Sequence, residues 1–218
     1  MPTLDYHMQL VKKLEIKSRE KIIEFLNSQP AGRIASIDRN GYPQVIPMNF
    51  VWADGAIYMH SHPAGEKLDN MLRNPQVGFE VDQHVCFLPS YYFHPTDASQ
   101  ADTLYISVVI KGTASLVRDN GEKARALNAL MEKYQKEGGY EQLAPEMPVL
   151  QEVAVIKVVP DEMRGKYKVG QHWSRPYRLK MAQNIIDREG LENAKPVLAI
   201  MGVVFKDGRL ELESDPEM

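Results

Sequence analysis

The sequence predicts a mainly β protein with flanking helices, built on six mostly antiparallel strands that form a closed or partly open barrel. Two tight turns separate three β-rich runs in the first third of the chain, a pattern typical of antiparallel strands. Few helices interrupt the later strands, so the strand–helix alternation that builds a parallel sheet is missing. No G-x-G-x-x-G motif opens a helix, which argues against a Rossmann domain.

The composition indicates an ordinary globular protein and gives no sign of a nucleic-acid or membrane partner. The chain has 218 residues, 44% of them apolar, and its 26 basic and 29 acidic side chains leave a net charge of −3. This balance gives no electrostatic basis for binding nucleic acid or an anionic membrane. The single cysteine, Cys86, excludes an internal disulfide and fits a reducing compartment. We expect a cytoplasmic protein, because charged residues from Asp5 onward interrupt the N-terminus and no run approaches the ~20 apolar residues of a membrane span.

The N-terminal third predicts one helix followed by three strands. Ser18 is a candidate N-cap for a short amphipathic helix over 17–27. The three β-rich runs span residues 33–37, 43–52 and 56–61. An Asn-Gly pair at 40–41 and an Asp-Gly pair at 54–55 provide the turns, because both pairs tolerate positive φ. We therefore expect an antiparallel meander.

The rest of the chain combines three further predicted helices with three further predicted strands. Further helices are predicted at 64–74, 121–135 and 177–189, and further strands at 76–82, 103–117 and 152–159. Pro160 is expected to end the last of these strands. The long stretch 83–102 predicts an irregular loop of the kind that serves as a lid or pocket wall. The tail from Lys195 fits either a helix or a hairpin.

The segment IYMHSHPAGEKLDNM runs from a strand through a glycine-containing turn into a helix. Such a turn directs backbone N–H groups and the positive end of the helix toward one point, and Lys67 adds a formal charge. These features make a candidate phosphate site, to which His60 and Ser61 could donate hydrogen bonds. From spacing alone, a surface turn with a solvated lysine is the more common outcome.

Other chemistries have weaker support. His60 and His62 would share a strand face as metal ligands do, but nothing locates a third ligand and no H-E-x-x-H motif occurs, so no metal is expected. Cys86 has apolar neighbours and fits a buried structural thiol. The basic segment RGKYKVGQHW (164–173) suits a small anion better than nucleic acid in a chain of this charge, although a solvated loop is an equal alternative.

Several ordered segments resemble one known family. They are GRIASIDRNGYPQVIPMNFVWADGAIYMHSHPAGEKLDNMLRNPQVGFEVD, YISVVIKGTASLV, KARALNALMEKY and RGKYKVGQ. Together they are similar to the pyridoxamine 5′-phosphate oxidase-related, FMN-binding split-barrel proteins, and most of all to the nitroimidazole-resistance branch. The resemblance covers roughly residues 18–175. It implies a six-stranded split barrel that forms a homodimer with FMN at the interface. The chain then divides into an arm (1–17), the FMN-binding domain (18–175) and a helical or hairpin C-terminal extension (176–218).

The resemblance also implies which residues contact FMN. The edge of the isoalloxazine ring would lie along Ile46, Pro47, Met48 and Asn49. His60 and Ser61 would end their strand under the ribityl chain, and the turn from Ala64 to Lys67 would hold the phosphate. His60 is the expected catalytic residue, since histidine titrates near neutral pH.

The remaining implied contacts come from later in the chain. Ser107 occupies the position of a cofactor-contacting glutamine of the true oxidases. Lys166 and Gln171 match a Gly-Lys…Gln motif that the partner subunit would contribute. The basic run that binds phosphate in the oxidases is thinned here, and their substrate-phosphate arginines have no evident counterpart. This departure argues against oxidation of vitamin B6.

Three functions follow from these expectations. The first is an FMN-dependent oxidoreductase that passes electrons to a small planar or nitroaromatic substrate. The second is a non-catalytic flavin-binding or regulatory protein, because relatives with a similar GKYKVGQ segment include negative regulators. The third is a haem-binding split barrel with a histidine as axial ligand.

Overall fold

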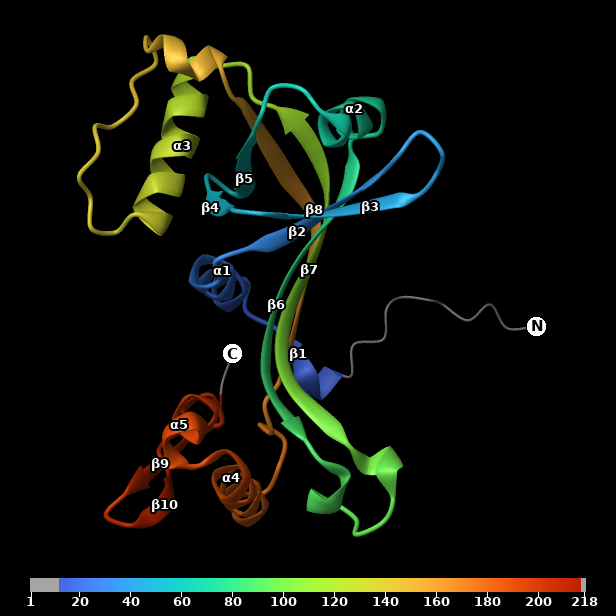
Figure 1. The fold of residues 1–218 in the computed structure, drawn as a ribbon, viewed down its shortest axis with the longest axis vertical. Helices are drawn as coiled ribbons and strands as arrows, with labels where there is room; N and C mark the ends of the chain where they lie inside the picture. The colour runs from blue at the N-terminus through green and yellow to red at the C-terminus, as the bar shows by residue number, and fades with distance from the viewer. Residues whose placement is uncertain (1–11, 217–218) are drawn as a thin grey trace. The chain divides into compact units, whose positions relative to one another are not determined.

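The computed structural model of the chain describes residues 12–216. The fold is mainly β with flanking helices, as predicted (Figure 1). The strands are β1 Glu15–Ile16, β2 Gly32–Ile37, β3 Pro43–Met48, β4 Val51–Ala53, β5 Ala56–Ser61, β6 Gln76–Leu88, β7 Asp102–Leu116, β8 Ala154–Lys168, β9 Val203–Lys206 and β10 Arg209–Leu212. The α-helices are α1 Arg19–Ser28, α2 Glu66–Arg73, α3 Asn120–Tyr134, α4 Arg175–Glu189 and α5 Leu191–Ile200. Short 3₁₀ helices span Lys12–Leu14, Ser90–Tyr92, Ala98–Gln100 and Pro148–Gln151.

Contacts divide the chain into two compact units. The first, which we call the barrel unit, contains residues 18–82 and 108–164. The second, the terminal unit, contains the described residues 12–17, 83–107 and 165–216. This division rests on contacts in space, whereas the predicted domains 1–17, 18–175 and 176–218 rest on family resemblance. The predicted domain boundaries therefore stay a prediction.

The sheet of the barrel unit has its two end strands joined by only two residues. Its strand order is β3-β2-β6-β7-β8-β5-β4, so β3 and β4 lie at opposite ends. Six strand spacings in a flat sheet would separate those ends by about 29 Å. Met48 and Val51, which flank the link, can be at most about 11 Å apart along three Cα steps. The sheet therefore has to curl until its two end strands come within about 11 Å of each other at the link, which gives it the shape of a barrel.

The two predicted turns are confirmed, but the predicted meander is wrong. Gly41 and Gly55 have φ of 86° and 77°, and they close the β2–β3 and β4–β5 hairpins. In the first turn, Asp38 Oδ1 accepts hydrogen bonds from the backbone N–H groups of Asn40 and Tyr42, at 2.7 and 2.8 Å. The predicted strand 43–52, however, is two strands, because the chain leaves one end of the sheet after β3 and enters the other with β4.

Three predicted boundaries are also corrected. Residues 83–88 continue β6 and are not part of an irregular loop. Pro160 does not end its strand, since β8 runs through it to Lys168. The main sheet has eight strands and not six, because the run 43–52 divides and the short β1 pairs with β8. For the tail, the sequence left a helix and a hairpin as alternatives, and the structure contains both: helix α5 is followed by the β9–β10 hairpin.

An apolar core fills the barrel unit. Phe50, in the two-residue link, is fully buried and meets Phe79 edge to face, with ring centroids 5.0 Å apart. A second cluster lies where α3 packs against β4 and β5, and it includes Tyr58, Ala126 and Leu130 (Figure 1). As predicted, Ser18 caps α1 by accepting a hydrogen bond from the backbone N–H of Lys21.

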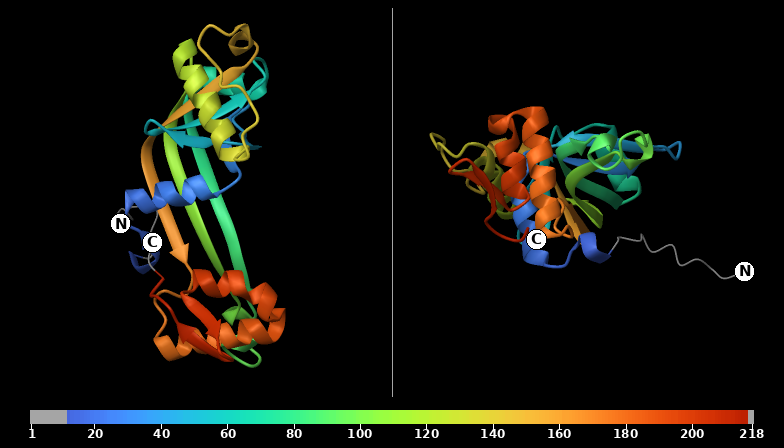
Figure 2. Two further views of the ribbon diagram at one scale, coloured as in Figure 1. Left: turned by 90° about the vertical axis from the view of Figure 1, so that its left-hand side faces the viewer. Right: turned by 90° about the horizontal axis from the view of Figure 1, so that it is seen from below.

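The terminal unit has a core of its own. Helices α4 and α5 pack against each other and against the β9–β10 hairpin (Figure 2). Their buried faces contribute Met181, Ile185 and Leu198, and Leu88 and Leu104 join the same cluster. Within residues 12–216, no helix combines the length and apolar character that crossing a membrane requires.

We predict that Gly112→Ala destabilises the protein by about 1–3 kcal/mol, the usual range for overpacking. A Cβ on Gly112 would lie 2.6 Å from the carbonyl oxygen of Val159 on β8, so one strand would have to shift. Gly78→Ala in β6 is the matched control, because its Cβ would meet Ala35 Cβ at an ordinary 3.6 Å. Urea unfolding checks this prediction, and equal free energies of unfolding for the two variants would contradict it.

Candidate functional site

The junction between β5 and α2 has the open geometry of an anion site. Gly65 is the N-cap of α2, and its φ of 144° is a conformation that favours glycine. A Cβ built on Gly65 would meet no atom within 4 Å, so the turn faces open space. Gly65 has no side chain to cap the helix, and the first-turn N–H groups therefore have no capping acceptor from it.

Lys67 carries the positive charge of this junction. Its side chain is half-buried, and its Nζ lies 3.5 Å from Met48 Sδ, a weak acceptor. Burial lowers the pKa of Lys67. Among the residues that the structure describes, no carboxylate forms an ion pair with Lys67. A bound anion would supply the missing negative charge.

The segment from Ile46 to Asn49 forms the neighbouring edge of the sheet. Strand β3 pairs only with β2, so the backbone groups on its other side have no ladder partner in the sheet. Met48 is buried, Ile46 is half-buried, and Pro47 and Asn49 are exposed. The contact between Met48 and Lys67 brings this edge and the anion site together.

Helix α3 fixes the chain immediately after this edge. The hydroxyl of Tyr134 lies 2.8 Å from the backbone nitrogen of Phe50, whose N–H donates to it, and 2.9 Å from the carbonyl oxygen of Pro30. Lys133 Nζ lies 3.7 Å from the centroid of the Phe50 ring and donates to the carbonyl oxygen of Leu26 at 3.2 Å. No local signal in the sequence identified Tyr134 as an anchor.

Polar side chains attach α2 to the first hairpin. Gln44 Nε2 donates to Glu66 at 2.8 Å, and Asn70, only 1% exposed, donates to Gln44 at 3.2 Å. Arg73 donates both to Asn70 Oδ1 and to the carbonyl oxygen of Ile37. These bonds hold α2, and with it Lys67, against β2 and β3. Such bonds are not evident from the sequence, because polar residues on a helix usually face solvent.

The residues at and after the end of β5 differ in whether their polar groups already form hydrogen bonds within the chain. His60 is exposed and lies opposite Val155 of β8. Ser61 is buried, and its hydroxyl donates to the carbonyl oxygen of His62 at 2.8 Å. Ala64 is exposed and its backbone N–H donates to His62 Nδ1 at 3.2 Å. Among residues 12–216, no hydrogen bond or ion pair engages the side chain of His60, which can therefore meet a ligand.

Ser107, Lys166 and Gln171 belong to the terminal unit. Ser107 is half-buried on β7, and Lys166 Nζ lies 5.0 Å from the centroid of the Tyr105 ring. The side chain of Gln171 bonds to its own chain: it accepts from the backbone N–H of Val169 at 3.1 Å and donates to two carbonyl oxygens, those of Tyr167 and Lys13. This pattern closes the turn after β8, a role that the sequence did not reveal.

The other candidates from the sequence have no assembled site. No group of three or more His, Cys, Asp or Glu side chains among residues 12–216 could hold a metal ion. Cys86 is buried, and burial raises the pKa of its thiol, as expected for a structural cysteine. His172 has a lowered pKa, mainly from burial and then from the charges of Lys13 and Lys168.

Comparisons with known proteins concern the family and the fold of the chain. A family model described as pyridoxamine 5′-phosphate oxidase matches residues 18–167. A solved structure of a candidate 5-nitroimidazole antibiotic resistance protein from Bacteroides thetaiotaomicron is 27% identical, with a TM-score of 0.59 over 70% of this chain and 86% of that one. A flavocytochrome from Azotobacter vinelandii is 20% identical, with a TM-score of 0.61 over 74% of this chain and 72% of its own.

A third solved structure, an FAD- and haem-binding protein from Mycobacterium smegmatis, is 16% identical, with a TM-score of 0.60 over 71% of this chain and 73% of its own. At such low identities, the likeness to this protein and to the flavocytochrome concerns the fold alone. No curated protein sequence matches the chain at a significant level.

We predict that Lys133 makes stability rise with pH in the alkaline range. Burial lowers the pKa of Lys133 from 10.5 to about 8 in the folded protein. Between these two values the unfolded chain binds more protons than the folded one, so the free energy of unfolding increases with pH. Urea unfolding of the wild type and of Lys133→Met, at several pH values across this range, isolates the effect. A difference between the two proteins that does not change with pH would contradict the prediction.

Proposed function

The chain belongs to the pyridoxamine 5′-phosphate oxidase family, and we propose that it is an FMN-binding flavoprotein that passes electrons from reduced flavin to a small planar or nitroaromatic substrate. One observation supports this most: Lys67 Nζ lies 3.5 Å from Met48 Sδ. Residues with expected roles at the phosphate and at the ring therefore adjoin, although they are far apart in the sequence. An elongated ligand with an anionic end and a flat end suits such a surface.

The β5–α2 junction has the chemistry that the FMN phosphate requires. Lys67 is half-buried and, among the residues that the structure describes, forms no ion pair with a carboxylate. The turn at Gly65 leaves open space beside the start of α2. A dianionic phosphate would satisfy both the ammonium and the helix N–H groups. Glu66 and Asp69 in the same first turn weaken this attraction, so we expect only moderate affinity.

The free edge of β3 supports the assignment of the ring. Flavin rings carry alternating hydrogen-bond donors and acceptors, which backbone groups from Ile46 to Asn49 could pair with.

His60 is the proposed catalytic residue, because it is exposed at the end of β5. Ser107, Lys166 and Gln171 stay proposed contacts, and Gln171 would have to give up its present bonds to bind FMN. When bound, the isoalloxazine ring supplies the redox chemistry, while the protein supplies binding and orientation.

An exposed apolar surface supports a homodimer. On the outer face of the β2–β3 hairpin, Ile37 lies opposite Pro43 and Ala35 lies opposite Val45. Ile37 is 40% exposed and Val45 is 57% exposed, so this face presents aliphatic side chains to a partner. A second copy of the chain would cover this face, which is continuous with the proposed ring edge at Pro47. A cytoplasmic location stays a prediction from the sequence.

The Bacteroides protein supports the choice of substrate class. It is 27% identical to this chain, and its name refers to 5-nitroimidazole antibiotic resistance. Nitroimidazoles are small, planar and readily reduced.

We predict that Lys67→Met weakens FMN binding by about 1–3 kcal/mol, the scale of one charge-assisted hydrogen bond. Riboflavin lacks the phosphate, so its affinity should stay the same in the variant. Fluorescence titration of both flavins against both proteins measures the effect. An equal loss for FMN and riboflavin would contradict the phosphate assignment and indicate a general disturbance of the site.

We also predict that bound, reduced FMN transfers electrons to a 5-nitroimidazole faster than free reduced FMN does, by about tenfold or more, equivalent to a barrier lowered by ~1.4 kcal/mol. Recovery of the oxidised flavin band under anaerobic conditions follows the reaction. His60→Gln should slow this step, whereas His84→Gln, an exposed histidine of the terminal unit, is the control. Reoxidation no faster than that of free FMN would overturn the enzymatic proposal and leave the non-catalytic alternative.

A further inference from the structure

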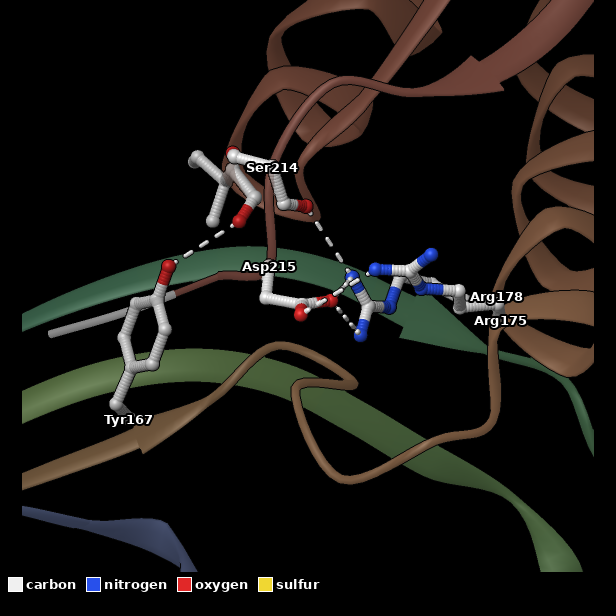
Figure 3. A network of polar contacts seen from close by, with 6 residues as sticks. Tyr167, Arg175, Arg178, Ser214 and Asp215 are labelled. Atoms are coloured by element: carbon white, nitrogen blue, oxygen red, sulfur yellow. Dashed lines mark hydrogen bonds and ion pairs between the residues drawn. The ribbon is translucent and has the colours of Figure 1, made fainter.

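Arg178, in the first turn of α4, is a buried charge outside the residues that the family model matches. It is only 2% exposed. A guanidinium stays protonated in proteins, so its burial requires acceptors for its five N–H groups and a compensating negative charge. Figure 3 shows where these acceptors come from: the segment Ser214–Asp215, which follows the β9–β10 hairpin.

The acceptors satisfy Arg178 incompletely. Its Nη1 and Nη2 both contact Asp215 Oδ1 at 3.3 Å, and Nη1 also contacts the carbonyl oxygen of Ser214 at 3.4 Å. These distances are longer than the usual 2.7–2.9 Å of a charge-assisted bond. The buried Nε has no hydrogen-bond partner. Asp215 therefore occupies the end of the guanidinium and leaves the edge that includes Nε without an acceptor.

The positive charge here exceeds the charge of one carboxylate. Arg175 Nη2 lies 3.9 Å from Asp215 Oδ2, so two guanidinium groups share Asp215 (Figure 3). The same position is close to the N-terminus of the 15-residue helix α4, whose N-cap, Ser174, makes no side-chain capping bond. The first turn of α4 contains no acidic residue. The helix dipole therefore adds to the two formal charges.

We propose that Arg178 and Arg175 form a binding site for a phosphate-type oxyanion, and that the carboxylate of Asp215 occupies this site as an internal substitute. A tetrahedral dianion has enough oxygens to accept from Nε and one Nη of Arg178 and to reach Arg175 as well. Its two charges match the two guanidinium groups. The ligand is either free phosphate or the phosphate group of a small phosphomonoester.

The present occupant is held only in part by its charge. Asp215 is 57% exposed at its side chain, and the tail is also attached through the backbone N–H of Glu213, which donates to the carbonyl oxygen of Gly202 at 3.0 Å. Pro216 is buried, so apolar contact holds the tail as well. Removing the carboxylate should therefore leave the backbone in place and free the guanidinium groups for another anion.

The test compares phosphate binding by the full-length wild type and Asp215→Ala. Thermal unfolding is followed while inorganic phosphate replaces chloride at constant ionic strength, and glycerol 3-phosphate is titrated in parallel to separate a phosphomonoester site from one for the free ion. We expect Asp215→Ala to bind one of the two probes at least about tenfold more tightly than the wild type does. A phosphate that binds near Lys67 contributes equally to both proteins and cancels in the comparison.

Two further variants, both in the Asp215→Ala background, locate the site. Arg178→Gln should abolish the added binding. Because loss of a buried arginine can prevent folding, Arg175→Gln is the second variant: its side chain is 74% exposed, and it should weaken the added binding without affecting folding. The proposal is overturned if Asp215→Ala binds neither probe more tightly than the wild type. It is also overturned if Arg175→Gln leaves the added binding unchanged.

Discussion

The fold depends on the link of two residues, Asn49 and Phe50, between strands at opposite ends of one sheet. Because so short a link cannot cross a flat sheet, it forces the strands to curl into a barrel. The side chain of Phe50 is fully buried, and its backbone N–H bonds to Tyr134, so the closure is held by apolar packing and by a hydrogen bond from α3. The sheet ends do not pair with each other, which leaves β3 with a free edge.

This closure also determines what can bind beside it. The free edge of β3 ends at Met48, just before the link, and Lys67 reaches Met48 from α2. The polar bonds of Asn70 and Arg73 hold α2 against the first hairpin, so the ammonium of Lys67 keeps its position next to that edge. Barrel closure thus places the free edge of β3 beside the positive charge of Lys67, and this arrangement supports the proposal of FMN.

Local sequence signals predicted the turns and caps correctly, because these depend on a few neighbouring residues. The Asn-Gly and Asp-Gly pairs closed their hairpins, and Ser18 capped its helix. The separation of β3 from β4 was not predictable in this way, since strand pairing depends on the whole sheet. Pro160 was wrongly expected to end β8. Tyr134 and Arg178 gained their roles from partners far away in the sequence, Phe50 and Asp215, and no local pattern marks such pairs.

A crystal structure of the protein with FMN would reveal the cofactor and the second copy of the chain together. We predict that the phosphate lies within about 3 Å of Lys67 Nζ and that the ring lies along residues 46–49. We also predict a second copy over the outer face of the β2–β3 hairpin. FMN bound away from α2, or an outer β2–β3 face left open to solvent, would show that the proposed cofactor site and homodimer are wrong.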